Sequence, residues 1–142
     1  MKLSSNADKV AKRVQAWSKN ITPELARATL EVATTITANA KREAPAATGR
    51  LRRSISYVAG GEARYIVSPN VPYAVPVHQG SRPHVIRPVR AKALFWKGAL
   101  HPVRVVNHPG TKGNPFMQRG LSASQAQIRQ IVARTGARIV AR

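Results

Sequence analysis

The sequence predicts an α+β protein in which long N-terminal helices and a C-terminal helix pack on an antiparallel β-sheet. Apolar residues recur with a helical period of about 3.6 residues near both ends of the chain. Between these ends, short runs alternate apolar and polar residues and are separated by Gly and Pro, as is typical of strands and turns. Because helices and strands do not alternate regularly along the chain, a parallel βαβ sheet is not expected.

Two helices are expected in the first third of the chain. The first covers residues 5–20 and is strongly basic. The second covers residues 22–43, with Thr22 as its N-cap and Pro23 at its first position. It is expected to end before Pro45, because the residue that precedes a proline disfavours helical backbone. The apolar stripe of the first helix consists of Val10, Val14, Trp17 and Ile21.

A β-hairpin is expected after these helices. Its first strand begins at Leu51 or nearer to Ser54, and it runs to Tyr57. Two glycines at residues 60–61 turn the chain into a second strand over residues 63–68.

A rigid connection follows over residues 68–83, because its four prolines exclude a central strand and leave room for one helical turn. Lys97 and Gly98 mark a turn further along the chain. Three more short strands are expected at residues 84–89, 93–96 and 103–106.

The last helix is expected to start at the segment NPFM. Asn114 is a good N-cap, Pro115 suits the first helical position and Phe116 begins an apolar stripe. Gly136 is expected to end the helix. The turn that precedes this helix consists of His108, Pro109 and Gly110.

The length of 142 residues predicts a single domain. Within it, residues 1–21 are expected to form a basic helical extension, residues 22–135 the α+β core and residues 136–142 a basic tail. Aromatic residues make up only 5% of the chain, so the core is modest and an oligomer or a docked partner is favoured.

Charge is the most informative feature of the composition. The chain has 24 Lys and Arg residues against 5 acids, which gives a net charge of +19. Such a charge predicts polyanionic partners, either nucleic acid or acidic protein surfaces. Without a membrane span or the apolar region of a signal peptide, the protein is expected to be soluble and made in a cytoplasm. The acids are Asp8, Glu24, Glu31, Glu43 and Glu62.

No catalytic, metal or cofactor site is predicted. The absence of cysteine excludes disulfides, thiolate zinc sites and a cysteine nucleophile. The glycine-rich loop is no P-loop, because Lys112 precedes Gly113 instead of following it and no Ser or Thr comes next. All acids precede residue 63, so no set of acid, base and nucleophile can be named. The four histidines lack metal-ligand spacing; they are His78, His84, His101 and His108.

An arginine cluster lies in the segment GRLRRS. Arginines bind phosphates and carboxylates well, because the planar guanidinium is always charged and offers several donors. Two interpretations remain open: an interface or DNA-facing patch, or a strand edge whose charges prevent aggregation. The basic residues assigned to this candidate site are Arg50, Arg52, Arg53, Lys41 and Arg42.

Three segments carry the pattern of a known family: AKREAPAATGRLRRSI, VPYAVPVHQGS and VNHPGTKGNPFMQRGL. Together they resemble the tail-completion or head–tail joining family of long-tailed bacteriophages, a minor tail component, over residues 30–125. One departure is Gln79, which stands where the family has an acid. The matching positions are Ala40, Lys41, Ala44, Pro45, Thr48, Gly49, Leu51, Arg52, Ser54 and Ile55, then Tyr73, Ala74 and Gly80, then His108, Gly110, Pro115 and Phe116.

The resemblance implies a non-enzymatic α+β subunit that assembles as a homo-oligomeric ring, a hexamer or a dodecamer, at the neck of the virion. Its implied partners are portal, adaptor or stopper, tail-terminator and tail-tube proteins, with non-specific contact to packaged DNA and none to a membrane. It implies synthesis in the bacterial host cytoplasm. The alternative is a basic nucleic-acid-binding protein. The expected structural corners contain Gly49, Tyr73, Gly80, His108, Pro109, Gly110, Pro115 and Phe116.

Overall fold

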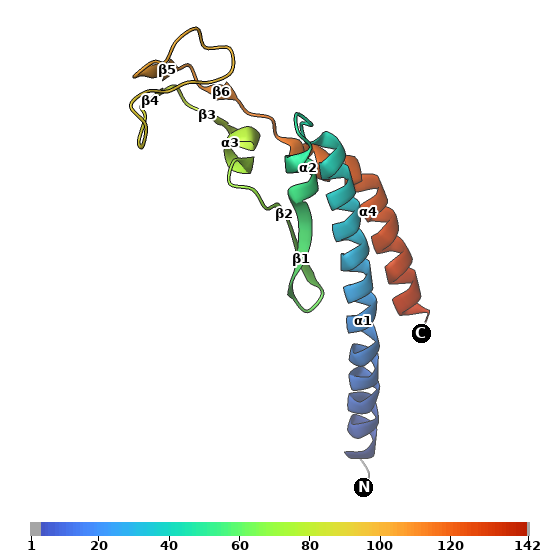
Figure 1. Ribbon diagram of the computed structural model, residues 1–142. Coiled ribbons are helices and arrows are strands. Elements are labelled where there is room, and N and C mark those ends of the chain that lie inside the picture. The colour runs from blue at the N-terminus through green and yellow to red at the C-terminus, as the bar shows by residue number, and fades with distance from the viewer. Residues whose placement is uncertain (1–3, 142) are drawn as a thin grey trace. The chain divides into compact units, whose positions relative to one another are not determined.

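The computed structural model describes residues 4–141 and divides the chain into two compact units (Figure 1). The first unit contains the chain up to Val71 and again from Phe116 onward. The second unit is the stretch Pro72–Pro115 between them. Helices dominate the first unit and short antiparallel strand pairs the second, so the α+β class is confirmed. The expected boundaries at residues 21 and 135 stay predictions.

Helix α1 spans Ser4–Glu43 without interruption, with Pro23 inside it. The predicted break between two helices at Thr22 and Pro23 is therefore wrong. The physical reason is the phase of the apolar stripe, which runs from Val10 at spacings of three and four residues to the buried Ala28. An uninterrupted helix keeps the whole stripe on one face, whereas a break would turn its two halves apart.

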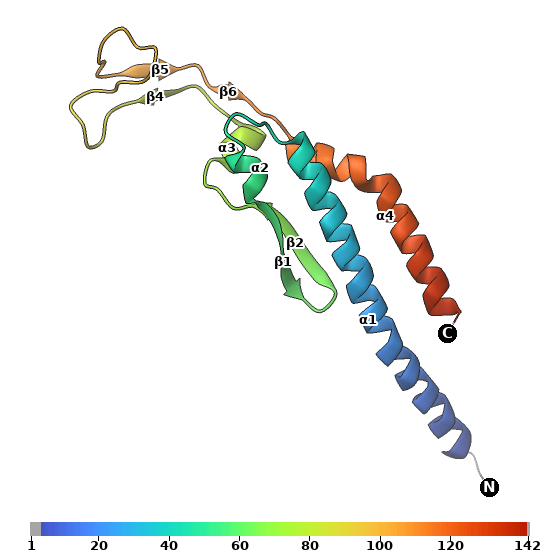
Figure 2. The same ribbon diagram turned by 45° about the vertical axis from the view of Figure 1, so that its right-hand side comes forward.

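Helix α4 spans Phe116–Val140 and packs along α1 (Figures 1 and 2). The helices approach closely at Gly120, where an added Cβ would lie 2.6 Å from the backbone N and Cα of Ala40. Phe116, at the start of α4, is fully buried.

Both predicted ends of α4 differ from the structure. The helix begins one residue after Pro115, and it continues four residues past Gly136. A glycine ends a helix when it adopts a positive φ, and Gly136 does not do so.

The β-hairpin packs on α1 within the first unit (Figure 2). Strands β1, Ile55–Gly61, and β2, Arg64–Pro69, pair antiparallel, with Tyr57 opposite Val67. The predicted hairpin is confirmed, but its turn lies at Glu62 and Ala63 instead of the two glycines, which belong to β1. A strand that starts at Leu51 is also wrong. Residues 50–54 form the short helix α2, Arg50–Ser54. Leu51 and Ile55 are both buried, and their spacing of four residues fits a helix face as well as a strand.

The second unit contains one short helix and four short strands. Strand β3 pairs with β6 and strand β4 pairs with β5, both antiparallel. The helical turn expected within residues 68–83 is confirmed as α3. Of the three further strands expected, the first is shortened to β4 before Pro88. The second is reduced to an isolated bridge between Leu94 and Val103, and the third overlaps β5 only at Val106. The bounds are α3 Ala74–Gln79, β3 Gly80–Ser81, β4 His84–Ile86, β5 Val106–His108 and β6 Thr111–Lys112.

Candidate functional site

The arginine cluster lies where α1 ends and α2 begins. Gly49 has a φ of 70°, a left-handed conformation that favours glycine, and it precedes the first residue of α2. Arg52 turns back toward α1: its Nε donates to the carbonyl oxygen of Ala44 at 2.7 Å and its Nη2 to that of Arg42 at 3.3 Å. These carbonyls end a helix and lack partners within it, so Arg52 caps α1 with a positive charge at its negative end.

The other basic residues of this candidate site reach solvent. Arg50 and Arg53 are exposed, and Arg53 makes one long side-chain hydrogen bond, 3.4 Å to the carbonyl oxygen of Thr48. Lys41 is half-buried, while Arg42 is exposed and donates to Asn39 Oδ1 at 3.2 Å. The structure therefore brings the five residues to one end of α1 and gives Arg52 a capping contact there.

The second and third motif segments meet inside the second unit, where β3 pairs with β6. Gly80 and Gly110 have φ values of 84° and 87°. A Cβ on Gly80 would collide with the carbonyl oxygen of Thr111, and one on Gly110 with that of Ser81. These two glycines allow the segments to approach more closely than any side chain would permit.

Local hydrogen bonds also stabilise the region around the β3–β6 pair. The Gly110 N–H donates to His108 Nδ1 at 3.1 Å, which closes the predicted turn. The Asn114 N–H donates to the carbonyl oxygen of Val77 at 2.9 Å. Tyr73 precedes the first residue of α3, and its carbonyl oxygen accepts from the Val77 N–H at 3.2 Å. Pro109 and Pro115 are exposed, as is Gln79.

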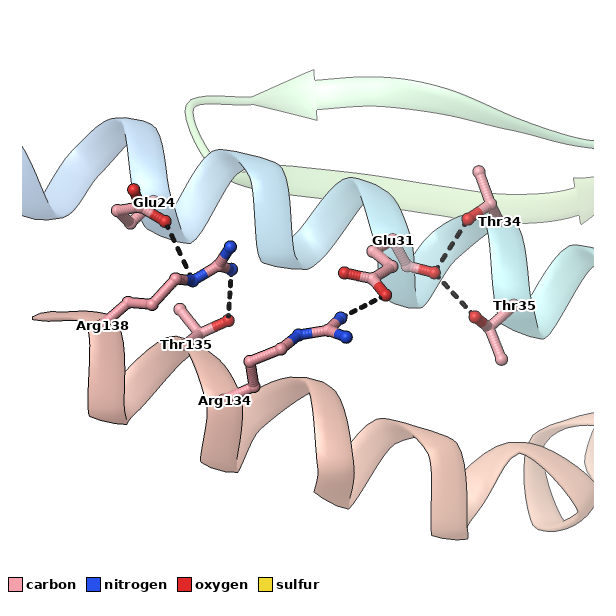
Figure 3. A network of polar contacts seen from close by, with 7 residues as sticks. All are labelled: Glu24, Glu31, Thr34, Thr35, Arg134, Thr135 and Arg138. Atoms are coloured by element: carbon pink, nitrogen blue, oxygen red, sulfur yellow. Dashed lines mark hydrogen bonds and ion pairs between the residues drawn. The ribbon is translucent and has the colours of Figure 1, made fainter.

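Three ion pairs join α1 to α4, with the acid on α1 in each case. Glu43 Oε2 lies 2.8 Å from Arg119 Nε, near the start of α4. Glu31 Oε1 lies 2.5 Å from Arg134 Nη2 (Figure 3). The third pair is partly buried and longer.

That third pair joins Glu24 Oε2 to Arg138 Nε at 3.6 Å, and the Glu24 side chain is 7% exposed (Figure 3). The spacing of Glu24, Arg27 and Glu31 by itself allows pairing along α1, but the structure directs both glutamates to arginines of α4.

Charge is distributed unequally between the two units. Three of the chain's five acids make these ion pairs in the first unit. The second unit contains seven cations and no acid. Its cations are Arg82, Arg87, Arg90, Lys92, Lys97, Arg104 and Lys112.

Residues 4–141 contain neither a candidate metal-binding cluster nor a candidate membrane-spanning helix. The described side chains contain no cluster of three or more His, Asp or Glu residues that could hold a metal ion. Over the same residues, no helix is both long and apolar enough to cross a membrane.

Comparison with known proteins identifies the class. The model of a family described as "Bacteriophage HK97-gp10, putative tail-component" matches residues 8–80, just over half of the chain. The chain belongs to this family, which makes it a bacteriophage tail component. The match includes the first motif segment and all of the second except its last residue, Ser81, and the third lies beyond it. No curated protein and no solved structure matches the chain.

Proposed function

We propose that this tail component is a non-enzymatic subunit of the phage neck, where it completes the tail or joins it to the head. The observation that carries the proposal is the distribution of charge. Acids are used within the first unit, between α1 and α4, while the second unit has seven cations and no acid. A surface of this kind suits the acidic rims of neighbouring rings, and it tolerates double-stranded DNA passing nearby.

The proposed neighbours are portal, adaptor or stopper, tail-terminator and tail-tube proteins. A structural role also fits the motif residues. Gly49, Gly80 and Gly110 shape turns, and Arg52 caps a helix. A subunit that acts by fitting between other proteins depends on a fixed backbone shape, and these residues determine that shape.

A homo-oligomeric ring, with six or twelve copies as the resemblance implies, is the proposed assembly. The first part of α1 exposes more than half of each of Val10, Val14 and Trp17. This stripe is in phase with Ala28 and Glu24, on the face of α1 that α4 covers further along. Because the exposed stripe continues the face on which α4 packs, we expect another helix to cover it, supplied by a second copy of the chain.

The outer face of α4 offers the complementary surface for such a copy. Leu121 and Val132 are 47% and 60% exposed, and they lie eleven residues apart on one side of the helix. Arg119, Arg134 and Arg138 are already paired with glutamates, which lowers the repulsion toward the basic start of α1. Two different surfaces that fit head to tail form a closed ring where the rotation between successive copies closes.

The function is tested by reversing the charges of Arg50 and Arg53 to Glu in the phage. Arg52 is retained, because its loss would remove the cap of α1 and confuse folding with docking. We expect infected cells to accumulate filled heads and separate tails, visible by electron microscopy, while the purified double variant melts at the normal temperature.

Two outcomes of this experiment would contradict the proposal. Normal virions would show that these two arginines only keep an exposed surface charged. Empty heads would place the requirement at DNA packaging or retention instead of tail joining. The double variant Arg50→Lys/Arg53→Lys is the matched control, since it keeps the charge and should still form virions.

A further inference from the structure

An apolar groove of about 430 Å³ lies within the second unit, between β4, β5 and the bridge that joins Leu94 to Val103. We refer to it as the second-unit groove. The residues that line it are Ile86, Leu94, Phe95, Trp96, Val106 and His108.

The two aromatic residues of the second-unit groove are unusually exposed. Phe95 is 68% exposed and Trp96 is 50% exposed. Large apolar side chains left in water in this way mark an interaction surface more often than a stable free surface. Aromatic residues in a concave setting are also the most frequent energetic centres of protein interfaces.

The charged residues that lie next to the groove's lining in sequence are all basic. Arg87 follows Ile86 directly, and Arg104 lies two residues before Val106. The whole second unit has no acid to neutralise these cations. Charge complementarity therefore favours an anionic occupant.

The lining of the groove favours a protein over a nucleic-acid duplex. A duplex presents phosphates and base edges, which gain little from an aliphatic wall. Ile86, Leu94 and Val106 form such a wall, and the volume is at the small end of ligand pockets, which run from about 300 to 1,000 Å³. A single large apolar side chain fits a hollow of this size and character.

We propose that the second-unit groove is a docking site for an acidic protein segment that inserts one large apolar side chain. The apolar side chain fills the hollow beside Phe95 and Trp96, and the carboxylates around it pair with the surrounding cations. The inference rests on the proposed function only in taking the natural partner to be another virion protein.

A selection from a library of random short peptides on the full-length protein tests this site directly. At physiological ionic strength we expect enrichment of peptides that combine several Asp or Glu residues with one Trp, Phe, Leu or Ile. In a Trp17→Phe background, Trp96 is the only tryptophan of the chain, so its emission should shift to the blue on binding.

Matched variants assign the binding to the groove. Phe95→Ser should weaken the best peptide at least about tenfold, the loss expected at an interface centre. Leu100→Ser is the control, because Leu100 is 98% exposed in the same unit and does not line the groove. It should change the affinity less than about twofold, as exposed positions away from an interface centre do.

Several results would overturn the proposal. They are enrichment of acidic peptides that lack an apolar residue, the absence of enrichment, equal effects of Phe95→Ser and Leu100→Ser, or a Trp96 shift with DNA and none with peptide. Because the selection uses no virion component, its failure would leave the neck role untouched. Conversely, normal virions from the Arg50 and Arg53 experiment would not affect this site.

Discussion

Glycines with opposite surroundings in one helix show how local contacts decide the effect of a single residue. A Cβ on Gly120 would meet the backbone of Ala40 at 2.6 Å, whereas a Cβ on Gly136 would meet nothing within 4 Å. Replacement by alanine should therefore lower the stability of the protein at Gly120 and raise it at Gly136.

Gly120→Ala should destabilise the protein by about 1–3 kcal/mol, the usual cost of overpacking a close contact. Gly136→Ala should stabilise it by up to about 1 kcal/mol, because alanine is the better helix former. Urea unfolding of both variants measures the difference. Equal effects would show that α1 and α4 do not approach each other at Gly120.

Arg52 and Arg50 also differ in how much their side chains are expected to contribute to stability, although they are only two residues apart. Arg52→Gln should lower stability by about 1–2 kcal/mol, since it removes a charged donor from the last carbonyls of α1. Arg50→Gln, at an exposed side chain, should stay within about 0.5 kcal/mol of the parent. Thermal unfolding provides the comparison, and a stable Arg52→Gln protein would contradict the capping role.

At the level of single residues, the sequence allowed some predictions and not others. The turn at His108, Pro109 and Gly110 could be predicted, because Pro and Gly have strong backbone preferences. The capping role of Arg52 could not, since the hydrogen bond to Ala44 depends on how α2 is oriented after Gly49.

At the level of elements, periodicity located the helices and the hairpin but not all of their ends. Pro23 is typical of a helix start, yet it lies inside α1, because the apolar stripe keeps its phase across it. Leu51 and Ile55 have a spacing that both a helix and an extended strand can accommodate. Periodicity alone does not distinguish these alternatives over five residues.

The start of α1 is expected to contribute to assembly and little to folding. Side chains described between residues 7 and 19 are exposed, and the ion pairs with α4 begin only at Glu24. Deletion of residues 2–20 should leave the melting temperature within a few degrees of the parent while reducing the oligomer mass measured by light scattering.

A longer deletion serves as the control for this prediction. Removal of residues 2–29 also takes away Glu24, with its contact to Arg138, and the buried Ala28, so its melting temperature should fall. If the shorter deletion unfolds the protein, the start of α1 belongs to the core. If that deletion assembles normally, the ring forms through another surface.

For the whole molecule, composition revealed the charge but not its arrangement. The ion pairs of Glu43 and Glu31 join residues 76 and 103 positions apart in sequence. Pairings over such separations depend on the packing of α4 along α1, which no local pattern contains. The excess of cations in the second unit could be counted directly, yet the groove beside Phe95 required the strand pairing of β4 and β5.

The alternative function, free nucleic-acid binding, makes a separate prediction for the isolated protein. Seven cations without an acid in the second unit will attract duplex DNA at low salt. A neck subunit has no need to hold DNA by itself, so the affinity should be non-specific and fall steeply with salt. At physiological ionic strength, we expect a Kd no tighter than the non-specific range of about 10⁻⁴ to 10⁻⁶ M.

Fluorescence anisotropy with two duplexes of unrelated sequence, titrated with salt, measures this affinity. The variant Arg87→Gln/Arg90→Gln/Lys92→Gln should flatten the salt dependence, because every phosphate that is no longer neutralised reduces the slope of log K against log salt by about 0.9. Arg134→Gln is a single-charge control, since Arg134 is paired with Glu31 and should matter little to DNA. Nanomolar binding at physiological salt, or a clear preference for one duplex, would favour the nucleic-acid-binding alternative over the neck role. Weak binding that is equal for both duplexes and decreases with salt would favour protein partners for the positive charge, in agreement with the partner proposed for the second-unit groove.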